Sequence, residues 1–425
     1  RLGAQDAIEL VVPAAEAALE GDSVRVLLPA IGAEYRGRLD PGGARIAGTF
    51  SQRGARFPLE LERTASPPSA ARPRPQDPKE PLPYLSEEVT FENPAAGIRL
   101  AGTFTRPRAP GRYPAALLIT GSGPQNRDEE LFGHRPFRVL ADHLTRQGIA
   151  VPRVDDRGVG GSTGRFQGAT SLDFASDVRA GVAYLKTRPD VDPRAIGLVG
   201  HSEGGLIAPI VAAESDDVAW IVLLPGPGLR GDSILLLQSA LVGRAAGLPE
   251  PAIARNQELQ RRLFALLREE LSDSAAAARA RTLIRETLAA LPPEERRAAG
   301  APAEGEAALD ALAAQRAREL ATPWFRFFID YDPRPTLRRV RVPVLALAGS
   351  LDLQVPAGPN LAAIRQALEE GGNRHVTTLE LPGLNHLFQT AKTGAPAEYA
   401  EIEETFAPAA LERIAAWIRE VTGRR

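Results

Sequence analysis

The stretch AIGLVGHSEGGLIAPIVAAE occupies residues 195–214. A short apolar run is followed by a run of helical character, so this stretch predicts a strand that turns sharply into a helix. The turn, GHSEG, fits the G-x-S-x-G pattern that holds a serine at a tight strand-to-helix corner. Glycines at 200 and 204 leave room for the corner, and the helix start favours developing negative charge. We therefore expect Ser202 to be a nucleophile; the alternative is a glycine-rich turn with an incidental serine.

Apolar runs of strand length recur on both sides of this corner and alternate with amphipathic helical runs. The expected strands are 115–120, 149–154, 195–199, 219–224, 343–348 and 376–381. A covering helix is expected at 171–187, with Ser171 as its N-cap, and the last helix is expected at about 407–421. Such alternation predicts an α/β fold with a mostly parallel sheet covered by helices on both faces.

The alternation stops between the strand ending near Leu224 and the strand starting near Pro343. Residues 231–330 are rich in Ala, Leu, Arg and Glu. An insertion of about a hundred residues is too long for a simple connection. We interpret 230–335 as a helical cap over the carboxyl edge of the sheet, which places the catalytic domain at 84–229 and 336–425.

The beginning of the chain is organised differently. Short strand-like runs within 23–62 are separated by turn-rich pieces, which predicts a small antiparallel β domain over residues 1–65. Residues 8–12 are a candidate further strand, and the start of this domain could be missing from the chain. Residues 66–83 contain seven prolines, which favour extended conformations, and we interpret them as an interdomain linker.

A serine hydroxyl needs a base to become a good nucleophile, and the chain has five histidines to choose from. His201 lies beside the nucleophile and cannot easily reach its oxygen, while His134 and His143 lie upstream, near or on a helix. His375 precedes the last expected strand. His386 follows that strand in LPGLNHLF, where the chain leaves the carboxyl edge at which active groups of open α/β sheets gather. We therefore predict that His386 is the general base.

The acid that orients this histidine should follow an earlier strand on the same edge. Asp352 follows the strand in VPVLALAGSLDLQVP, and there it would hold the tautomer of His386 and stabilise the imidazolium. An aspartate that only forms an Asx-turn is the alternative. The chain order Ser202, Asp352, His386 is the order expected for a nucleophile on such a corner.

An oxyanion hole requires two backbone N–H groups directed at the developing alkoxide. Glu203 should supply one, because it directly follows the nucleophile. The glycine-rich loop TGSGP at 120–124 follows an early strand and should supply the other. We expect this donor to be the amide of Ser122, with Gly123 as the second choice. The alternative is a glycine-rich turn that binds nothing.

Two further segments are candidates for the substrate pocket. The aromatic run 324–331 contains Trp324 and Phe328, which we expect to line the pocket with Gly123, as apolar ligand sites commonly have such walls. These aromatic side chains could instead anchor the cap to the sheet domain. The run DDRG at 155–158 is interpreted as a buried ion pair that fixes its loop near the oxyanion loop; a role in the pocket is the alternative.

Five segments together resemble bacterial α/β-hydrolase esterases of the EstD-like kind, which are related to serine aminopeptidase-type hydrolases. The segments are GHSEGG (200–205), TGSGPQNRDE (120–129), DDRGVGGSTG (155–164), GSLDLQVP (349–356) and LPGLNHLFQTAKTG (381–394). The resemblance covers roughly 84–425, and 23–62 resembles the small β domain that precedes such hydrolases. It implies the α/β-hydrolase fold, carboxylesterase activity on short acyl esters, no cofactor, and often export, although the chain contains no signal segment. The HGGG form of the oxyanion loop is lacking, which leaves the second amide donor open.

Composition narrows the remaining possibilities. The chain has no cysteine, which excludes disulfides, thiolate metal sites and a cysteine nucleophile. A formal net charge of -2 gives no general attraction to nucleic acid, and no apolar run is long enough to span a bilayer. We expect a small-molecule ester as substrate and no metal. A serine peptidase or amidase with the same three residues is the second hypothesis, and a binding protein on an inactive hydrolase scaffold is the third.

Overall fold

The computed structural model describes residues 16–28, 33–52, 55–62, 73–302 and 305–423. Contacts divide the chain into two compact units, Arg1–Ala71 and Arg72–Arg425. Each unit has its own sheet and is described separately below.

The first unit is a five-stranded antiparallel sheet whose strands are paired in chain order. Its strands are β1 (Glu16–Glu20), β2 (Ser23–Leu28), β3 (Ala33–Leu39), β4 (Arg45–Gln52) and β5 (Ala55–Glu62). Tyr35 is buried, and its hydroxyl donates to the carbonyl oxygens of Ile46 and Leu59, both at 3.0 Å. A Cβ on Gly48 would lie 2.6 Å from the Tyr35 ring, so this glycine gives the ring its place against the sheet. The predicted antiparallel β domain is confirmed; β1 was not predicted, and residues 8–12 lie outside the described residues.

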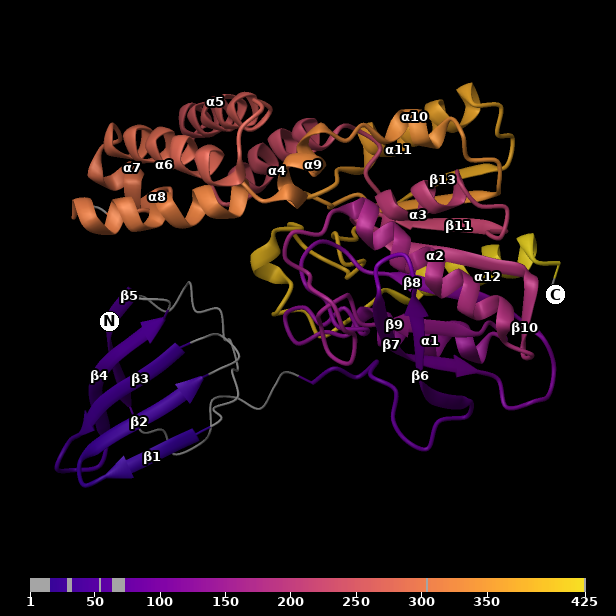
Figure 1. Cartoon of the computed structure of the whole chain (residues 1–425), viewed down its shortest axis with the longest axis horizontal. Coiled ribbons are helices and arrows are strands. Elements are labelled where there is room, and N and C mark those ends of the chain that lie inside the picture. Colours follow the sequence, from indigo (N-terminus) through magenta and orange to yellow (C-terminus); the bar gives the residue numbers. More distant parts are fainter. Residues whose placement is uncertain (1–15, 29–32, 53–54, 63–72, 303–304, 424–425) are drawn as a thin grey trace. The chain divides into compact units, whose positions relative to one another are not determined.

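The second unit contains a mostly parallel sheet (Figure 1). Its strands are β6 (Leu85–Asn93), β7 (Ile98–Arg106), β8 (Tyr113–Ile119), β9 (Val151–Val154), β10 (Val191–His201), β11 (Trp220–Leu224), β12 (Val344–Gly349) and β13 (Val376–Leu381). Five strands are parallel in the order β13-β12-β11-β10-β8, and the antiparallel group β6-β7-β9 joins them through a parallel bridge between Ala115 and Ala150. The predicted fold class is therefore confirmed.

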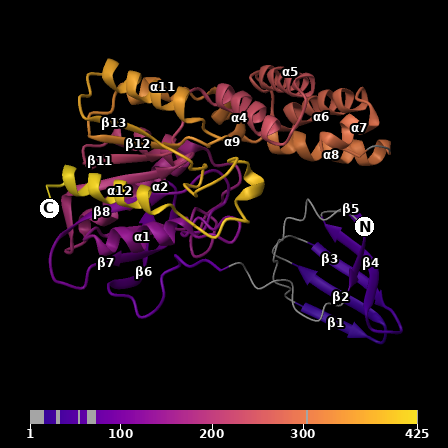
Figure 2. The same ribbon diagram turned by 180° about the vertical axis from the view of Figure 1, so that it is seen from behind.

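Helices cover both faces of this sheet because alternate residues of its strands point to opposite sides. Ala115, Leu117 and Ile119 of β8 belong to one apolar core, whereas Ala116 and Leu118 belong to the other. The first core is covered by α2 (Ser171–Thr187), α3 (Gly204–Ala212) and α11 (Ala357–Glu370). The second core is covered by α1 (Pro136–Arg146) and α12 (Pro408–Val421), which face the viewer in Figure 2.

The start of α2 differs by one residue from the sequence prediction. Thr170, not Ser171, is the N-cap, and it forms a capping box with Asp173. Ser171 is the first helical residue, so its hydroxyl is free for another contact, described below. Either residue type can cap a helix, which is why the pattern alone did not separate them.

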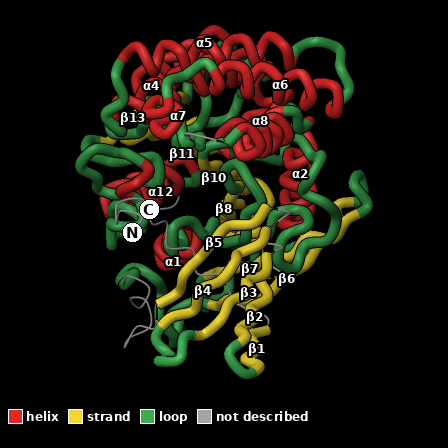
Figure 3. Tube along the Cα trace, turned by 90° about the vertical axis from the view of Figure 1, so that its left-hand side faces the viewer, coloured by secondary structure: helices red, strands yellow, loops and turns green. Residues whose placement is uncertain are grey.

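Between β11 and β12 the chain forms a layer of helices, which we name the helical insertion (Figure 3). It consists of α4 (Gly231–Ala245), α5 (Glu250–Leu267), α6 (Asp273–Ala289), α7 (Pro293–Ala298), α8 (Glu306–Leu320) and α9 (Pro323–Asp330), and α10 (Pro333–Leu337) leads back to the sheet. The insertion has an apolar core of its own, in which alanines of α6 and α8 are fully buried and let the two helices approach closely. Among the described helices, none combines the length and apolar character needed to cross a bilayer.

The described part of the proline-rich segment is bound to the second unit. The Arg74 guanidinium donates to the carbonyl oxygens of Ile402 at 2.5 Å and Ala400 at 3.1 Å. The Gln76 side chain donates to the carbonyl of Phe406 at 2.7 Å and accepts from the amide of Thr405 at 2.6 Å. From Arg74 onward this segment is therefore fastened to the loop that precedes α12.

Candidate active site

The loops that carry the predicted site residues leave the same edge of the second unit's sheet. Thr120 follows β8, Ser202 follows β10, Asp352 lies in the loop after β12, and His386 lies in the loop after β13. These four strands are parallel, so their carboxyl ends lie at one edge.

The backbone at Ser202 forms a tight corner. Its φ is 52°, in the left-handed region that side chains other than glycine rarely adopt. The corner is fixed by the Ser202 amide, which donates to the carbonyl of Leu224 at 2.6 Å, and by the Ser202 carbonyl, which accepts from Gly205 at 2.9 Å. A Cβ on Gly200 would lie 2.0 Å from the Gly204 oxygen, so no larger residue fits there. The serine is thus held at the start of α3.

Asp352 and His386 form a buried pair. Nδ1 of His386 lies 2.8 Å from Oδ2 of Asp352, and both side chains are almost fully buried. The other carboxylate oxygen, Oδ1, accepts from the amides of Gln354 and Val355, each at 2.8 Å. The orientation of the carboxylate is therefore fixed, and it holds the proton of a neutral His386 on Nδ1, which leaves Nε2 free to accept a proton.

The loop of His386 lies against the corner that carries Ser202. His201 directly precedes the serine, and its Nε2 lies 3.1 Å from the carbonyl oxygen of His386. The rings of His201 and His386 are 4.9 Å apart. Within the described residues, no hydrogen bond joins the Ser202 hydroxyl to His386. Contacts between serine and base often tighten only when a substrate binds.

The loop after β8 lies beside Ser202 as well. A Cβ on Gly121 would lie 3.3 Å from Cβ of Ser202. The Gly121 amide is already used, because it donates to Oε1 of Glu129 at 2.6 Å. By contrast, the amides of Ser122 and Glu203 have no hydrogen-bond partner among the residues that the structure describes. These are the two amides that the sequence suggested for the oxyanion hole.

The Glu203 side chain connects the corner to other elements. It is 2% exposed, and its Oε1 accepts from the Ser171 hydroxyl at 2.6 Å and from Nε1 of Trp324 at 2.7 Å. Burial raises the pKa of Glu203 above its usual range. Trp324 belongs to α9 of the helical insertion and stacks on Phe328 with ring centres 5.4 Å apart. Trp324 thus attaches the insertion to the carboxyl edge of the sheet.

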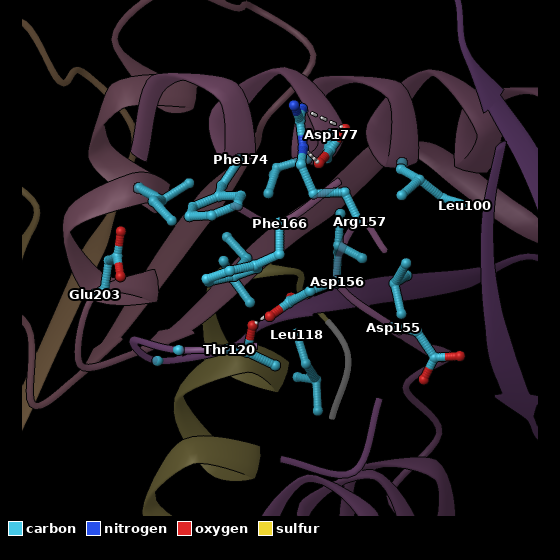
Figure 4. A pocket seen from close by; sticks show the side chains of 18 of the residues that line it. Leu100, Leu118, Thr120, Asp155, Asp156, Arg157, Phe166, Phe174, Asp177 and Glu203 are labelled. Carbon is cyan, nitrogen blue, oxygen red and sulfur yellow. Dashed lines mark hydrogen bonds and ion pairs between the residues drawn. The ribbon is translucent and has the colours of Figure 1, made fainter. Parts of the chain in front are cut away.

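A cavity of about 50 Å³ lies beside the loop that follows β8 (Figure 4). Glu203 and Gly123 line it, and Phe166 and Phe174 form an apolar wall with ring centres 5.1 Å apart. Among the residues expected to form a pocket, Gly123 lines this cavity. Trp324 and Phe328 are not among the described residues that line it.

The DDRG run forms part of the same cavity. Asp156 accepts from the Thr120 hydroxyl at 2.8 Å and from the Gln125 amide at 2.9 Å, so it fixes the loop that follows β8. Burial raises the pKa of Asp156 to about 7. Arg157 forms a bidentate pair with Asp177 of α2, at 2.7 and 3.0 Å. The ion pair expected for this run is therefore present, between Arg157 and Asp177. Asp156 instead accepts hydrogen bonds from two uncharged donors.

His134 and His143 lie in surroundings that suit a structural role. His134 is fully buried between the Thr405 hydroxyl and the Tyr399 carbonyl, and burial lowers its pKa to about 4. His143 is half-buried on α1. His201, in contrast, contacts Glu129, a residue that sequence reasoning did not single out. No cluster of three or more metal-ligating side chains occurs in the described ranges.

The strand order, the serine corner after β10 and the insertion after β11 are those of the α/β-hydrolase fold. Residues 135–287 match the family described as serine aminopeptidase, S33. Esterase EstD of Thermotoga maritima is 25% identical over 324 residues, which cover 75% of this chain and 65% of that protein. The match thus spans slightly less than two thirds of the relative's length.

Two solved structures are also similar. A complex of DcsB with its substrate analogue has 19% sequence identity and a TM-score of 0.49, and the match covers 79% of this chain and 99% of that chain. The esterase Pf2001 of Pyrococcus furiosus has 16% identity and a TM-score of 0.46, and the match covers 80% of this chain and 94% of that chain.

Proposed function

We propose that this chain is a serine carboxylesterase that hydrolyses short-chain acyl esters through an acyl-enzyme on Ser202. The observation that carries the proposal is the buried pair of His386 and Asp352. The loop of His386 is held against the serine corner by His201. The similarity to an esterase supports the same reaction type.

In this mechanism, Nε2 of His386 takes the proton of Ser202 as the hydroxyl attacks the ester carbonyl. The oxyanion of the tetrahedral intermediate is stabilised by the unpaired amides of Glu203 and Ser122. His386 then donates the proton to the departing alcohol. Water attacks the acyl-enzyme in the second half of the reaction, with His386 again as base. Asp352 stabilises the imidazolium in both halves.

The cavity beside the oxyanion loop is our candidate for the acyl pocket. A buried space needs roughly 10–15 Å³ for each water-sized group. A volume of about 50 Å³ therefore accommodates roughly four heavy atoms. The mainly apolar wall of this cavity suits an alkyl chain. We therefore expect acetyl to butyryl esters to be preferred over octanoyl esters.

Ser202→Ala tests the proposal. The variant should keep the fold, because alanine removes only the hydroxyl, and it should lose ester hydrolysis of p-nitrophenyl acetate. The exposed Ser274 of α6 offers a matched control, since Ser274→Ala makes the same chemical change far along the chain. A fluorophosphonate should label the wild type and the control but not Ser202→Ala. Wild-type turnover by Ser202→Ala would disprove the assignment.

A serine peptidase or amidase acting on short peptides is the second candidate. It is favoured by Glu203, a buried acid at the cavity whose hydrogen-bond partners, Ser122, Ser171 and Trp324, are all neutral. Such a carboxylate could bind the amine of a substrate. Comparing p-nitrophenyl acetate with amino-acid p-nitroanilides separates the two candidates. If no substrate reacts and fluorophosphonate leaves Ser202 unlabelled, the chain is a binding protein on a hydrolase scaffold.

A further inference from the structure

A second acid–histidine pair lies beneath the proposed catalytic residues. Glu129 is 1% exposed and His201 is 6% exposed. Nδ1 of His201 lies 2.9 Å from Oε1 of Glu129, the same oxygen that accepts from the Gly121 amide at 2.6 Å. On the other side of the ring, Nε2 lies 3.1 Å from the carbonyl oxygen of His386. The proposed mechanism does not use this pair.

The two partners of His201 are both acceptors. A carboxylate and a backbone carbonyl cannot donate a proton, so both contacts are hydrogen bonds only when both ring nitrogens carry hydrogen. That state is the imidazolium, with Glu129 as its counter-ion. Burial opposes a charge on His201, but the Glu129 carboxylate, the His386 carbonyl and the Asp352 carboxylate together outweigh burial and raise the pKa of His201.

The pair joins three segments that the reaction requires. Glu129 holds the amide of Gly121, which precedes the oxyanion donor Ser122. His201 precedes the nucleophile and holds the loop of His386 through its carbonyl. One buried ion pair therefore connects the oxyanion loop, the serine corner and the loop of the base.

The two sides of the His201 ring have different neighbours. The imidazolium faces His386, with ring centres 4.9 Å apart, while Glu129 bonds to the nitrogen on the opposite side of the ring. Among the described residues, Asp352 pairs with His386 and also acts electrostatically on His201, and Tyr399 lies near Asp352 and the backbone of His386.

We propose that Glu129 and His201 are positioning residues: their ion pair holds the oxyanion loop and the His386 loop against Ser202. This inference rests on the proposed function, because it assigns the pair a role in the same reaction.

Glu129→Gln is the main test. The glutamine oxygen can still accept from Gly121 and from Nδ1 of a neutral His201, whose Nε2 would then face the His386 carbonyl without a hydrogen. We expect kcat for p-nitrophenyl acetate to fall at least tenfold, with KM changed less than threefold. Glu130→Gln, the same change at the exposed neighbouring position, is the matched control and should change neither quantity.

Two further measurements do not depend on activity. In the Ser202→Ala background, nitrogen NMR of the five histidines should show one ring protonated on both nitrogens at pH 8, and His201→Gln should remove that signal. If all histidines are neutral at pH 8, or if Glu129→Gln raises KM as much as it lowers kcat, the proposed role is wrong. Retained hydrolysis by Ser202→Ala would instead disprove the esterase mechanism, and the NMR result would still decide the state of His201.

Discussion

Asp352→Asn should remove most of the activity while leaving the fold intact, and the reason lies in the geometry of the carboxylate. Oδ1 accepts from the amides of Gln354 and Val355, and Oδ2 faces Nδ1 of His386. In asparagine only one of the two atoms is an acceptor, and the two backbone amides require it on their side. The NH₂ group must then face His386.

This arrangement reverses the tautomer of the base. Nδ1 of His386 has to accept from the new NH₂ group, so the proton of the neutral ring moves to Nε2, the nitrogen that should take the proton of Ser202. In a serine protease with the same arrangement, the equivalent change lowers kcat by about 10⁴. Such a loss corresponds to about 5.5 kcal/mol of transition-state stabilisation, at about 1.4 kcal/mol for each factor of ten. Both backbone hydrogen bonds remain, so the midpoint of thermal unfolding should change little.

The assay is kcat for p-nitrophenyl acetate near pH 8, together with thermal unfolding of the same preparations. Asp310→Asn is a suitable control, because Asp310 pairs with Arg281 on an exposed part of α8. A fall of 10³ or more with an unchanged unfolding midpoint supports the reasoning. Activity within tenfold of the wild type would show that Asp352 does not set the tautomer of His386.

Two other predictions concern the cavity beside the oxyanion loop. Phe174→Ala removes part of the cavity wall. The ratio of kcat/KM for the octanoyl ester to kcat/KM for the acetyl ester should then rise about tenfold or more, since each buried methylene contributes about 0.8 kcal/mol. The exposed Leu172→Ala on the same helix should leave this ratio unchanged, and an unchanged ratio in Phe174→Ala would contradict the pocket assignment. The second prediction concerns Asp156, whose pKa in the folded protein is raised to about 7. Between about pH 4 and 7 the folded state therefore binds more protons than the unfolded chain. The free energy of unfolding should thus fall as the pH rises through this window, by up to about 4 kcal/mol. Asp156→Asn should remove this loss, which a comparison of unfolding midpoints at pH 5 and pH 8 will measure; pH dependences equal to those of the wild type and of Asp310→Asn would refute it.

The parallel core of the fold was accessible from sequence because its strands are apolar on both faces. All residues of β8 and β12 are buried, and these strands were predicted within two residues of their observed bounds. By contrast, β6 has an exposed face that carries Glu88, Thr90 and Glu92, and the sequence analysis did not find this strand. An edge strand of this kind has neither a long apolar run nor a helical period, so it lacks the signal by which the central strands were found.

The proposed catalytic residues were accessible for a related reason. Ser202, Asp352 and His386 each follow a recognisable strand, so topology alone placed them at one edge. Glu129 and His201 were not recognised as a pair. They are 72 positions apart, and Glu129 lies in a loop whose path no periodicity determines. The available signal was a histidine inside the G-x-S-x-G turn, a buried position at which a titratable ring needs a partner.

The contacts of Arg74 and Gln76 have a practical consequence for dividing this chain. Excising the hydrolase unit at residue 84, where the proline-rich segment ends, would strip the donors from the carbonyls of Ile402 and Phe406. Those carbonyls precede α12, which together with α1 covers one face of the sheet. An expression boundary placed before Arg74 keeps these hydrogen bonds. The proline-rich composition alone would have suggested that the whole segment could be removed.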